Sequence, residues 1–290
     1  MTSIEMVTQL PAPHCNKITM TPYREGIKAP ATAPPVKPSA RVTMAHYLIT
    51  GASSGIGAAL ASHLARRGHE VSGVARRHDR LRDLAAKYRQ FHPYSADVTD
   101  VASIASVVET ATTHAGPIDV AILNAGIYQP QDSSQIDPAV YAKHMDVNYM
   151  GVVNTLAPVI RSMVARKAGH IAITSSVAGW RGLPKSAAYG PTKAALISLA
   201  ESLYFDLTPK GIKVQVICPG FVDSEATAVN DFEMPHLISA DRAATYILDG
   251  LESADFSIEF PKAFTRRMGL LRWLPDRLYF WLVGRQTGAL

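Results

Sequence analysis

At 290 residues, with 47% hydrophobic and 18% charged residues, the chain has the composition of an ordinary globular protein with ample apolar material for a core. The formal net charge is +5, but the first 43 residues hold five basic and two acidic side chains, so the remainder is nearly neutral and no nucleic-acid partner is indicated. No apolar run reaches the roughly 18 residues of a membrane span, and Cys15 and Cys218 form no metal-binding CxxC pair. We therefore expect reducing, cytoplasmic surroundings and no metal site.

Residues 1–43 differ from the rest of the chain because they contain seven prolines and lack apolar periodicity. Proline breaks long helices and central strands, so we predict a disordered extension. One alternative is a transit peptide. Another is that the natural chain starts at Met44, because a strand is predicted directly after it.

From His46 onward, short apolar runs typical of strands alternate with longer runs typical of helices. The predicted strands are 46–49, 71–75, a third that ends at 97–99, 118–123, 170–174, 213–218 and 257–260. The predicted helices are 55–67, 79–90, 101–114, 138–166 and 187–207. This alternation predicts an α/β fold, namely a single Rossmann-type doubly wound domain over residues 44–261 with a mostly parallel seven-stranded sheet and helices on both faces.

A glycine-rich turn at residues 50–57 follows the first predicted strand and opens the first predicted helix. Glycines let a pyrophosphate approach the backbone, and the helix N-terminus offers it free N–H groups and a partial positive charge. A plain structural turn is the alternative, but the strand–turn–helix context favours nucleotide binding. The predicted contacts from this turn are Gly51, Ser53, Ser54, Gly55, Ile56 and Gly57.

The end of the second predicted strand indicates which dinucleotide binds. A carboxylate there bonds the ribose 2′-hydroxyl of NAD, whereas arginine accommodates the 2′-phosphate of NADP. This chain has Arg76 and Arg77 at that place and no carboxylate, so NADP(H) is favoured over NAD(H). The alternative is that both arginines are solvated surface charges.

Tyr189 and Lys193 stand four residues apart at the start of the predicted helix 187–207, so their side chains share one helix face. The ordinary pKa of a tyrosine is about 10, and a nearby ammonium group lowers that pKa by stabilising the phenolate. Tyr189 is therefore a candidate acid and base for a carbonyl or alcohol oxygen. Ser176 follows the predicted strand 170–174 and is a candidate partner for the same oxygen. Taken alone, the first two residues are more typical of a surface pair, and Ser176 of a capping serine.

Together these features resemble the classical short-chain dehydrogenase/reductase family over roughly residues 46–260. Further matches to the family's motifs are Asp97-Val98, Asn124-Ala125-Gly126, Asn148 and Pro219-Gly220. There are two departures. Ser224 stands where the family often has threonine in the loop after Pro219-Gly220, and Ser54 stands where NADP-type members often have a basic residue in the glycine turn.

The resemblance implies a role for each of four catalytic residues. Ser176 would orient the substrate oxygen and Tyr189 would transfer the proton. Lys193 would bind the nicotinamide ribose and lower the pKa of Tyr189, and Asn148 would support a water-linked proton relay. The full set of implied cofactor contacts is Gly51, Ser53, Ser54, Gly55, Ile56, Gly57, Arg76, Asp97, Val98, Asn124, Ala125, Gly126, Tyr189, Lys193, Pro219, Gly220, Val222 and Ser224.

Residues near the substrate are indicated less sharply. Trp180, Leu183, Phe221 and Val222 suggest an apolar pocket but suit ordinary packing equally well, and residues 221–236 are expected to form a mobile lid. Residues 262–290 mix large apolar side chains with arginines and predict a helical tail. That tail fits a membrane interface, a dimer interface or packing against its own domain.

The predicted function is hydride transfer between NADP(H) and a carbonyl or secondary alcohol, with an apolar small-molecule substrate and reduction as the favoured direction. One alternative is a nucleotide-sensing regulator without catalysis, which the presence of Tyr189 and Lys193 disfavours. Another is a membrane-surface reductase of lipid metabolism. We expect a cytoplasmic homodimer or homotetramer, with peripheral membrane contact through residues 262–290 as a possibility.

Overall fold

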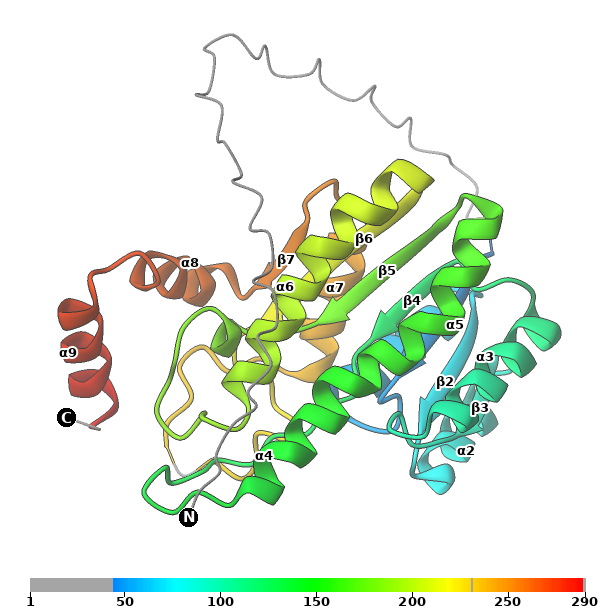
Figure 1. Cartoon of the computed structure of the whole chain (residues 1–290). Helices are drawn as coiled ribbons and strands as arrows, with labels where there is room; N and C mark the ends of the chain where they lie inside the picture. The colour runs from blue at the N-terminus through cyan, green and yellow to red at the C-terminus, as the bar shows by residue number, and fades with distance from the viewer. Residues whose placement is uncertain (1–43, 231, 289–290) are drawn as a thin grey trace, which may run out of the picture. The chain divides into compact units, whose positions relative to one another are not determined.

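The structure of the protein is a computed structural model that describes residues 44–230 and 232–288, so the extension predicted for residues 1–43 lies outside the described residues. The strands are β1 His46–Thr50, β2 Glu70–Ala75, β3 Phe91–Ser95, β4 Val120–Leu123, β5 Gly169–Thr174, β6 Ile212–Pro219 and β7 Ser257–Phe260. They form one sheet in the order β3-β2-β1-β4-β5-β6-β7 (Figure 1). Every neighbouring pair is parallel, so the predicted doubly wound fold is confirmed.

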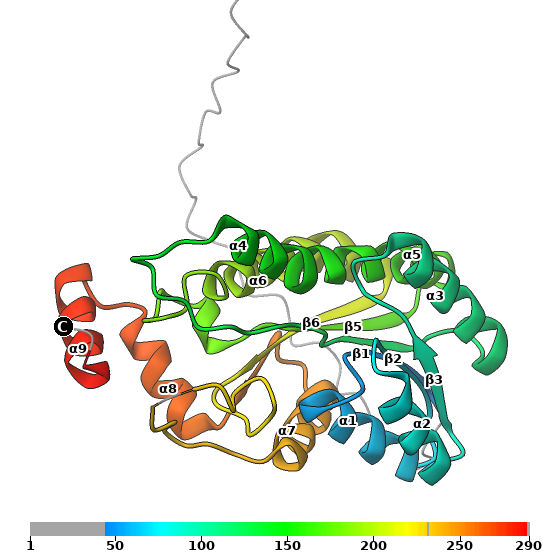
Figure 2. The ribbon, with the colours of Figure 1, turned by 90° about the horizontal axis from the view of Figure 1, so that it is seen from below.

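Helices cover both faces of this sheet. Their bounds are α1 Gly55–Arg66, α2 His78–Lys87, α3 Val101–Ala115, α4 Pro138–Met145, α5 Gly151–Arg166, α6 Gly190–Leu207, α7 Ala240–Glu252, α8 Lys262–Leu271 and α9 Asp276–Thr287. Figure 2 shows α3, α4, α5 and α6 on one face and α1, α2 and α7 on the other. Within the described part of the chain, no helix combines the length and the apolar character that crossing a bilayer requires.

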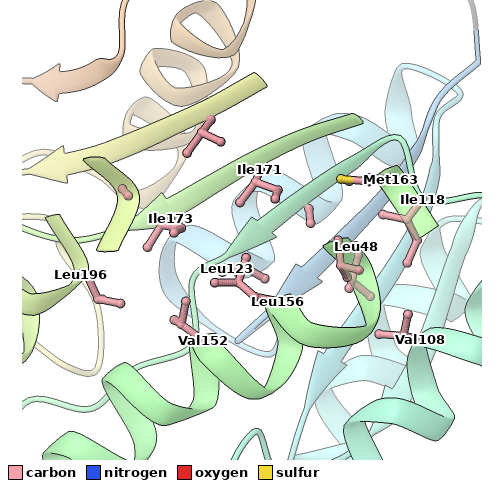
Figure 3. Packing of buried hydrophobic residues seen from close by; sticks show 14 of the residues in the cluster. Leu48, Val108, Ile118, Leu123, Val152, Leu156, Met163, Ile171, Ile173 and Leu196 are labelled. Atoms are coloured by element: carbon pink, nitrogen blue, oxygen red, sulfur yellow. The ribbon is translucent and has the colours of Figure 1, made fainter. Parts of the chain in front are cut away.

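The core is split by the sheet into two layers. On the α5 side, Leu123 and Ile173 from the strands pack with Leu156 from α5 (Figure 3). On the opposite side, Leu60 and Leu64 of α1 belong to a second buried cluster with residues of α7. Each such side chain stabilises the fold by about 1.5–3 kcal/mol through burial, so both faces of the sheet are held rigidly.

The end of the third strand was predicted wrongly. The strand stops at Ser95, whereas Asp97 and Thr99 form a turn in which the Asp97 carboxylate accepts hydrogen bonds from the Thr99 N–H and hydroxyl, at 3.0 and 2.8 Å. This local bonding satisfies the backbone outside the sheet. Pro93 is tolerated in β3 because β3 is an edge strand.

The predicted helix 138–166 is interrupted by one π-helical turn at Asp146–Met150 between α4 and α5. Asn148 in this turn is fully buried. Its amide bonds the backbone of Ile127 and the hydroxyl of Thr192, which lie on other elements. Single π turns of this kind often occur at functional sites. Because these hydrogen-bond partners are distant in sequence, helical periodicity does not predict the interruption of the helix.

Candidate active site

A cavity of about 1640 Å³ lies at the carboxyl ends of the strands, where ligands bind in open α/β sheets. All the predicted cofactor contacts line it except Gly57, and so do Ser176, Tyr189 and Lys193 among the predicted catalytic residues. Gly57 lies beneath the glycine turn, where a Cβ atom would come within 2.3 Å of the carbonyl oxygen of Gly51. Its predicted role therefore changes from direct contact to allowing helix α1 to approach the turn.

The glycine turn is held against the ends of two strands. Gly51 adopts a φ of +73°, which favours glycine, and its N–H donates to the carbonyl of Val74 on β2 at 2.8 Å. The hydroxyl of Thr50 on β1 accepts hydrogen bonds from the N–H groups of Asn124 and Ala125, at 3.0 and 3.1 Å, just after β4. This fixes the point at which the strand order reverses. Sequence reasoning missed Thr50, although a hydroxyl at a strand end was a usable signal.

Arg77, rather than Arg76, reaches the glycine turn. Its Nε donates to the hydroxyl of Ser53 at 3.2 Å and its Nη2 to the hydroxyl of Ser54 at 2.6 Å. Arg76 is 63% exposed and lies 3.9 Å from the Asp97 carboxylate. Ser54 stands where a basic residue would bring positive charge to the turn. In this chain the guanidinium of Arg77, just after β2, brings that charge instead.

The Arg77 guanidinium is also paired with a carboxylate from the segment that follows β6. Glu225 accepts from Arg77 at 2.6 Å and from Arg80 of α2 at 2.5 Å. The hydrogen bond from Arg77 is the largest cause of a lowered pKa for Glu225. The ion pair between Arg77 and Glu225 links the predicted lid to the arginine end of the cavity. These two residues are about 150 positions apart in the sequence, so no local pattern indicates the contact.

Tyr189 immediately precedes α6, which begins at Gly190 rather than at the predicted residue 187. Pro191 suits this first turn because it needs no N–H donor there. Burial raises the pKa of Tyr189 above its ordinary value, while a hydrogen bond with Ser176 acts in the opposite direction. This direction is opposite to the lowered pKa that the sequence led us to expect.

Lys193 lies one helical turn further along α6 and is 3% exposed. Its Nζ donates to the carbonyl of Thr174 at 2.9 Å and lies 5.5 Å from the centre of the Tyr189 ring. Burial lowers the pKa of Lys193 to about 8. An ammonium group held here stabilises a negative charge that forms on the neighbouring phenol.

Asn148 stands behind these residues and does not line the cavity. A Cβ atom on Gly126 would lie 3.2 Å from the Asn148 side-chain oxygen and 3.6 Å from Lys193 Nζ, so the three residues are close neighbours. The amide of Asn148 fixes the backbone at Ile127, with distances of 2.7 and 3.0 Å. Its relay role stays a prediction.

Tyr128 is a site residue that sequence reasoning missed. Its ring packs edge-on against Tyr189 with centres 5.0 Å apart, and its hydroxyl donates to the side-chain oxygen of Asn230 at 3.1 Å. It therefore connects Tyr189 to the segment after β6. Nothing local marked it, because a tyrosine after a strand is common.

The far end of the cavity is largely apolar and is closed by the C-terminal helices. Leu183, Phe221 and Val222 line the cavity as predicted, whereas Trp180 is not among its lining residues and packs against the α5-side core instead. Helices α8 and α9 add further wall residues that the sequence did not place: Arg267, Met268, Leu270, Leu271, Leu282, Val283 and Gln286.

Comparison with known proteins agrees with this arrangement. The family model described as short chain dehydrogenase matches residues 45–233. An uncharacterized oxidoreductase of Myxococcus xanthus is 36% identical over 236 residues, covering 80% of this chain and 93% of that protein. A short-chain dehydrogenase from Sphingobium yanoikuyae, solved in complex with NADPH, superposes with a TM-score of 0.69 at 29% identity, covering 80% of this chain and 97% of that one. The chain therefore belongs to the short-chain dehydrogenase/reductase family of oxidoreductases.

Proposed function

We propose that this oxidoreductase uses NADPH to reduce an apolar ketone or aldehyde to the alcohol. The observation that carries the proposal is a desolvated Tyr189 hydroxyl, hydrogen-bonded with Ser176 and close to the Lys193 ammonium, inside a cavity with an apolar far end. A phenol whose phenolate a neighbouring ammonium group can stabilise is suited to give a proton to a carbonyl oxygen, which is the step that reduction requires.

The residues present fit a dinucleotide with a 2′-phosphate. The turn around Gly51 lines the cavity and leads into the N-terminus of α1, whose first backbone N–H groups would bind a pyrophosphate. Arg77 and Arg76 lie beside that turn and suit a phosphate on the adenosine ribose. The similar short-chain dehydrogenase from Sphingobium yanoikuyae, at 29% identity, was solved with NADPH and supports this choice.

The chain's own residues handle the substrate oxygen. When bound, the reduced nicotinamide supplies a hydride to the carbonyl carbon. Ser176 holds the carbonyl oxygen by a hydrogen bond, and Tyr189 gives its hydroxyl proton to that oxygen as the C=O bond becomes C–O–H. The Lys193 ammonium stabilises the phenolate left on Tyr189, which then regains a proton from water.

Replacing Tyr189 by phenylalanine tests this assignment. We expect Tyr189→Phe to lower kcat for ketone reduction by about 10²- to 10⁴-fold, the usual contribution of a positioned acid, because the ring remains but the proton is lost. The assay is NADPH oxidation, followed by absorbance, with a panel of apolar ketones and aldehydes and with NADH in parallel. The affinity for NADPH should change little.

Tyr128→Phe is the matched control because it removes a hydroxyl from the adjacent ring. It should lower kcat far less than Tyr189→Phe does. Full activity of Tyr189→Phe, or an equal loss in both variants, would contradict the proposed role. NADH as the better cofactor would contradict the proposed use of NADPH.

A further inference from the structure

Helices α8 and α9 and the turn between them carry an exposed apolar face that the proposed reaction does not use. Five large side chains, here called the tail face, make it up: Leu270, Trp273, Leu278, Phe280 and Trp281, with 72, 78, 43, 56 and 54% of their surface exposed. Single exposed apolar residues are ordinary, but five within twelve positions are a concentration of the kind that marks an interaction site.

The tail face is held in a fixed orientation. At 100° per residue, Leu278 and Trp281 of α9 point to one side of the helix, whereas Tyr279 and Val283 point to the other and are 1 and 7% exposed. The Tyr279 hydroxyl donates to the carbonyl of Gly182 at 2.7 Å. The buried face of α9 therefore fastens the helix to the domain and leaves Leu278 and Trp281 exposed.

The same segment is strongly basic. Residues 262–288 contain six lysines and arginines and one acid, Asp276, for a net charge of +5. That acid is paired with Arg181 of the domain. The guanidinium of Arg272 lies 5.1 Å from the Trp273 ring centre, and that of Arg285 lies 5.7 Å from the Trp281 ring centre. Apolar rings and positive charges are thus presented together.

The combination of exposed aromatic rings and basic side chains distinguishes between two candidate partners, a second copy of the chain and a lipid bilayer. A symmetric contact between two copies brings the same patch of each together, so the basic groups of two tail faces would repel. An anionic membrane surface instead attracts each basic group and accepts tryptophan and phenylalanine at the level of its headgroups. We propose that the tail face docks this protein, reversibly and without spanning, on anionic lipid bilayers.

The cavity supports the same placement. Leu270 belongs to the tail face and also lines the cavity, together with Leu271 and Leu282 of the adjoining helices. The apolar end of the cavity therefore adjoins the surface that would contact lipid. Docking is independent of the proposed reaction, because it rests on the exposed side chains and their charge alone.

The test is co-sedimentation of the full chain with vesicles. We expect binding to vesicles of mixed phosphatidylglycerol and phosphatidylcholine, weaker binding at high salt because exposed charges are screened, and little binding to pure phosphatidylcholine. Trp273→Ala with Trp281→Ala should weaken binding by about tenfold or more through lost apolar contact. Phe205→Ala removes an aromatic side chain that is 75% exposed on α6 and should leave vesicle binding unchanged.

Trp273→Phe with Trp281→Phe should retain most of the binding, and thermal unfolding curves verify that each variant is folded. Failure of the wild-type chain to bind anionic vesicles would overturn the proposal. So would equal binding to neutral vesicles, or equal binding by the double alanine variant. A loss of oligomers in that variant, without vesicle binding by the wild type, would assign the face to a second copy. No arm of the test requires turnover, so its failure is distinct from failure of the proposed reaction.

Discussion

At the scale of single residues, Arg77 is paired with the Glu225 carboxylate and is also the candidate partner of a cofactor phosphate. Arg77 donates to Ser53 and Ser54 of the glycine turn and is paired at the same time with Glu225. A 2′-phosphate at this place would compete with Glu225 for the guanidinium. Glu225 would therefore weaken binding of such a phosphate, and in this structure it links the segment after β6 to Arg80 of α2.

Substitutions on the two sides of this pair should change NADPH affinity in opposite directions. Arg77→Gln should weaken NADPH binding because a phosphate partner is lost, whereas Glu225→Gln should strengthen it, by about fivefold at most for such exposed pairs. Affinity is measured by fluorescence titration with NADPH and with NADH. Binding of NADH should change little, because it lacks the 2′-phosphate.

Asp223→Asn is the control for the second substitution, since it removes one negative charge from the same exposed segment. If Asp223→Asn strengthened NADPH binding as much as Glu225→Gln, the effect would come from net charge rather than from the pair with Arg77. An equal gain in NADH affinity would lead to the same conclusion.

At the scale of elements, β5 and β6 carry a polar cluster away from the candidate catalytic residues. The Nε2 atom of His170 lies 2.8 Å from the side-chain oxygen of Gln215, whose amide donates to the carbonyl of Asp255 at 2.5 Å. Lys213, opposite His170 in the register, donates to the carbonyls of Leu251 and Ser253. These bonds tie the α7–β7 connection to the sheet.

His170 should make this part of the fold sensitive to acid. Burial, followed by the charge of Lys213, lowers the pKa of His170 from 6.5 to about 4. Between these two values the unfolded chain binds a proton that the folded chain does not, so stability falls as pH is lowered through that window, by about 3 kcal/mol in full. His170→Gln should flatten this loss, as measured by urea unfolding at pH 7, 5.5 and 4.5.

His78→Gln, at an exposed position on α2, is the control and should keep the wild-type dependence on pH. The assignment fails if His170→Gln loses as much stability between pH 7 and 4.5 as the wild-type chain does.

At the scale of the whole molecule, one loop holds the C-terminal helices over the apolar end of the cavity. Arg181 donates to the carbonyl of Leu274 at 2.6 Å, pairs with Asp276 at 2.5 Å and stacks 3.9 Å from the centre of the Tyr279 ring. Its side chain is 18% exposed, so these contacts are largely shielded from water. The wall formed by α9 therefore depends on a few polar contacts rather than on a broad core.

Arg181→Ala should loosen α9 and open the substrate end. Charge-assisted hydrogen bonds contribute about 1.5–3 kcal/mol, so we expect KM for an apolar ketone to rise roughly tenfold while NADPH affinity stays the same. Trypsin should also cut the tail faster. Arg285→Ala, a change of the same type on the exposed side of α9, should do neither. A fall in NADPH affinity comparable to the rise in KM would indicate general damage to the fold instead.

Much of the fold and of the candidate site could be predicted from local sequence patterns. The alternation of apolar strands and longer helices gave the doubly wound sheet, because burial on both faces imposes that pattern on each segment separately. The order of the glycine turn, Ser176, Tyr189 and Lys193 placed these residues at one end of the sheet, because parallel strands present their carboxyl ends along one edge. The structure brings these residues together around one cavity.

Other features depended on residues far apart in the chain. The choice of Arg77 over Arg76, its pairing with Glu225 and the π-helical turn at Asn148 follow from contacts that form only when separate elements pack. The raised pKa of Tyr189 has the same origin, because desolvation belongs to the assembled cavity and not to the spacing of tyrosine and lysine. The sequence by itself thus determined the fold and the positions of the chemical groups, while the tertiary structure decided their protonation, their partners and the wall that α9 builds, because those depend on packing between distant segments.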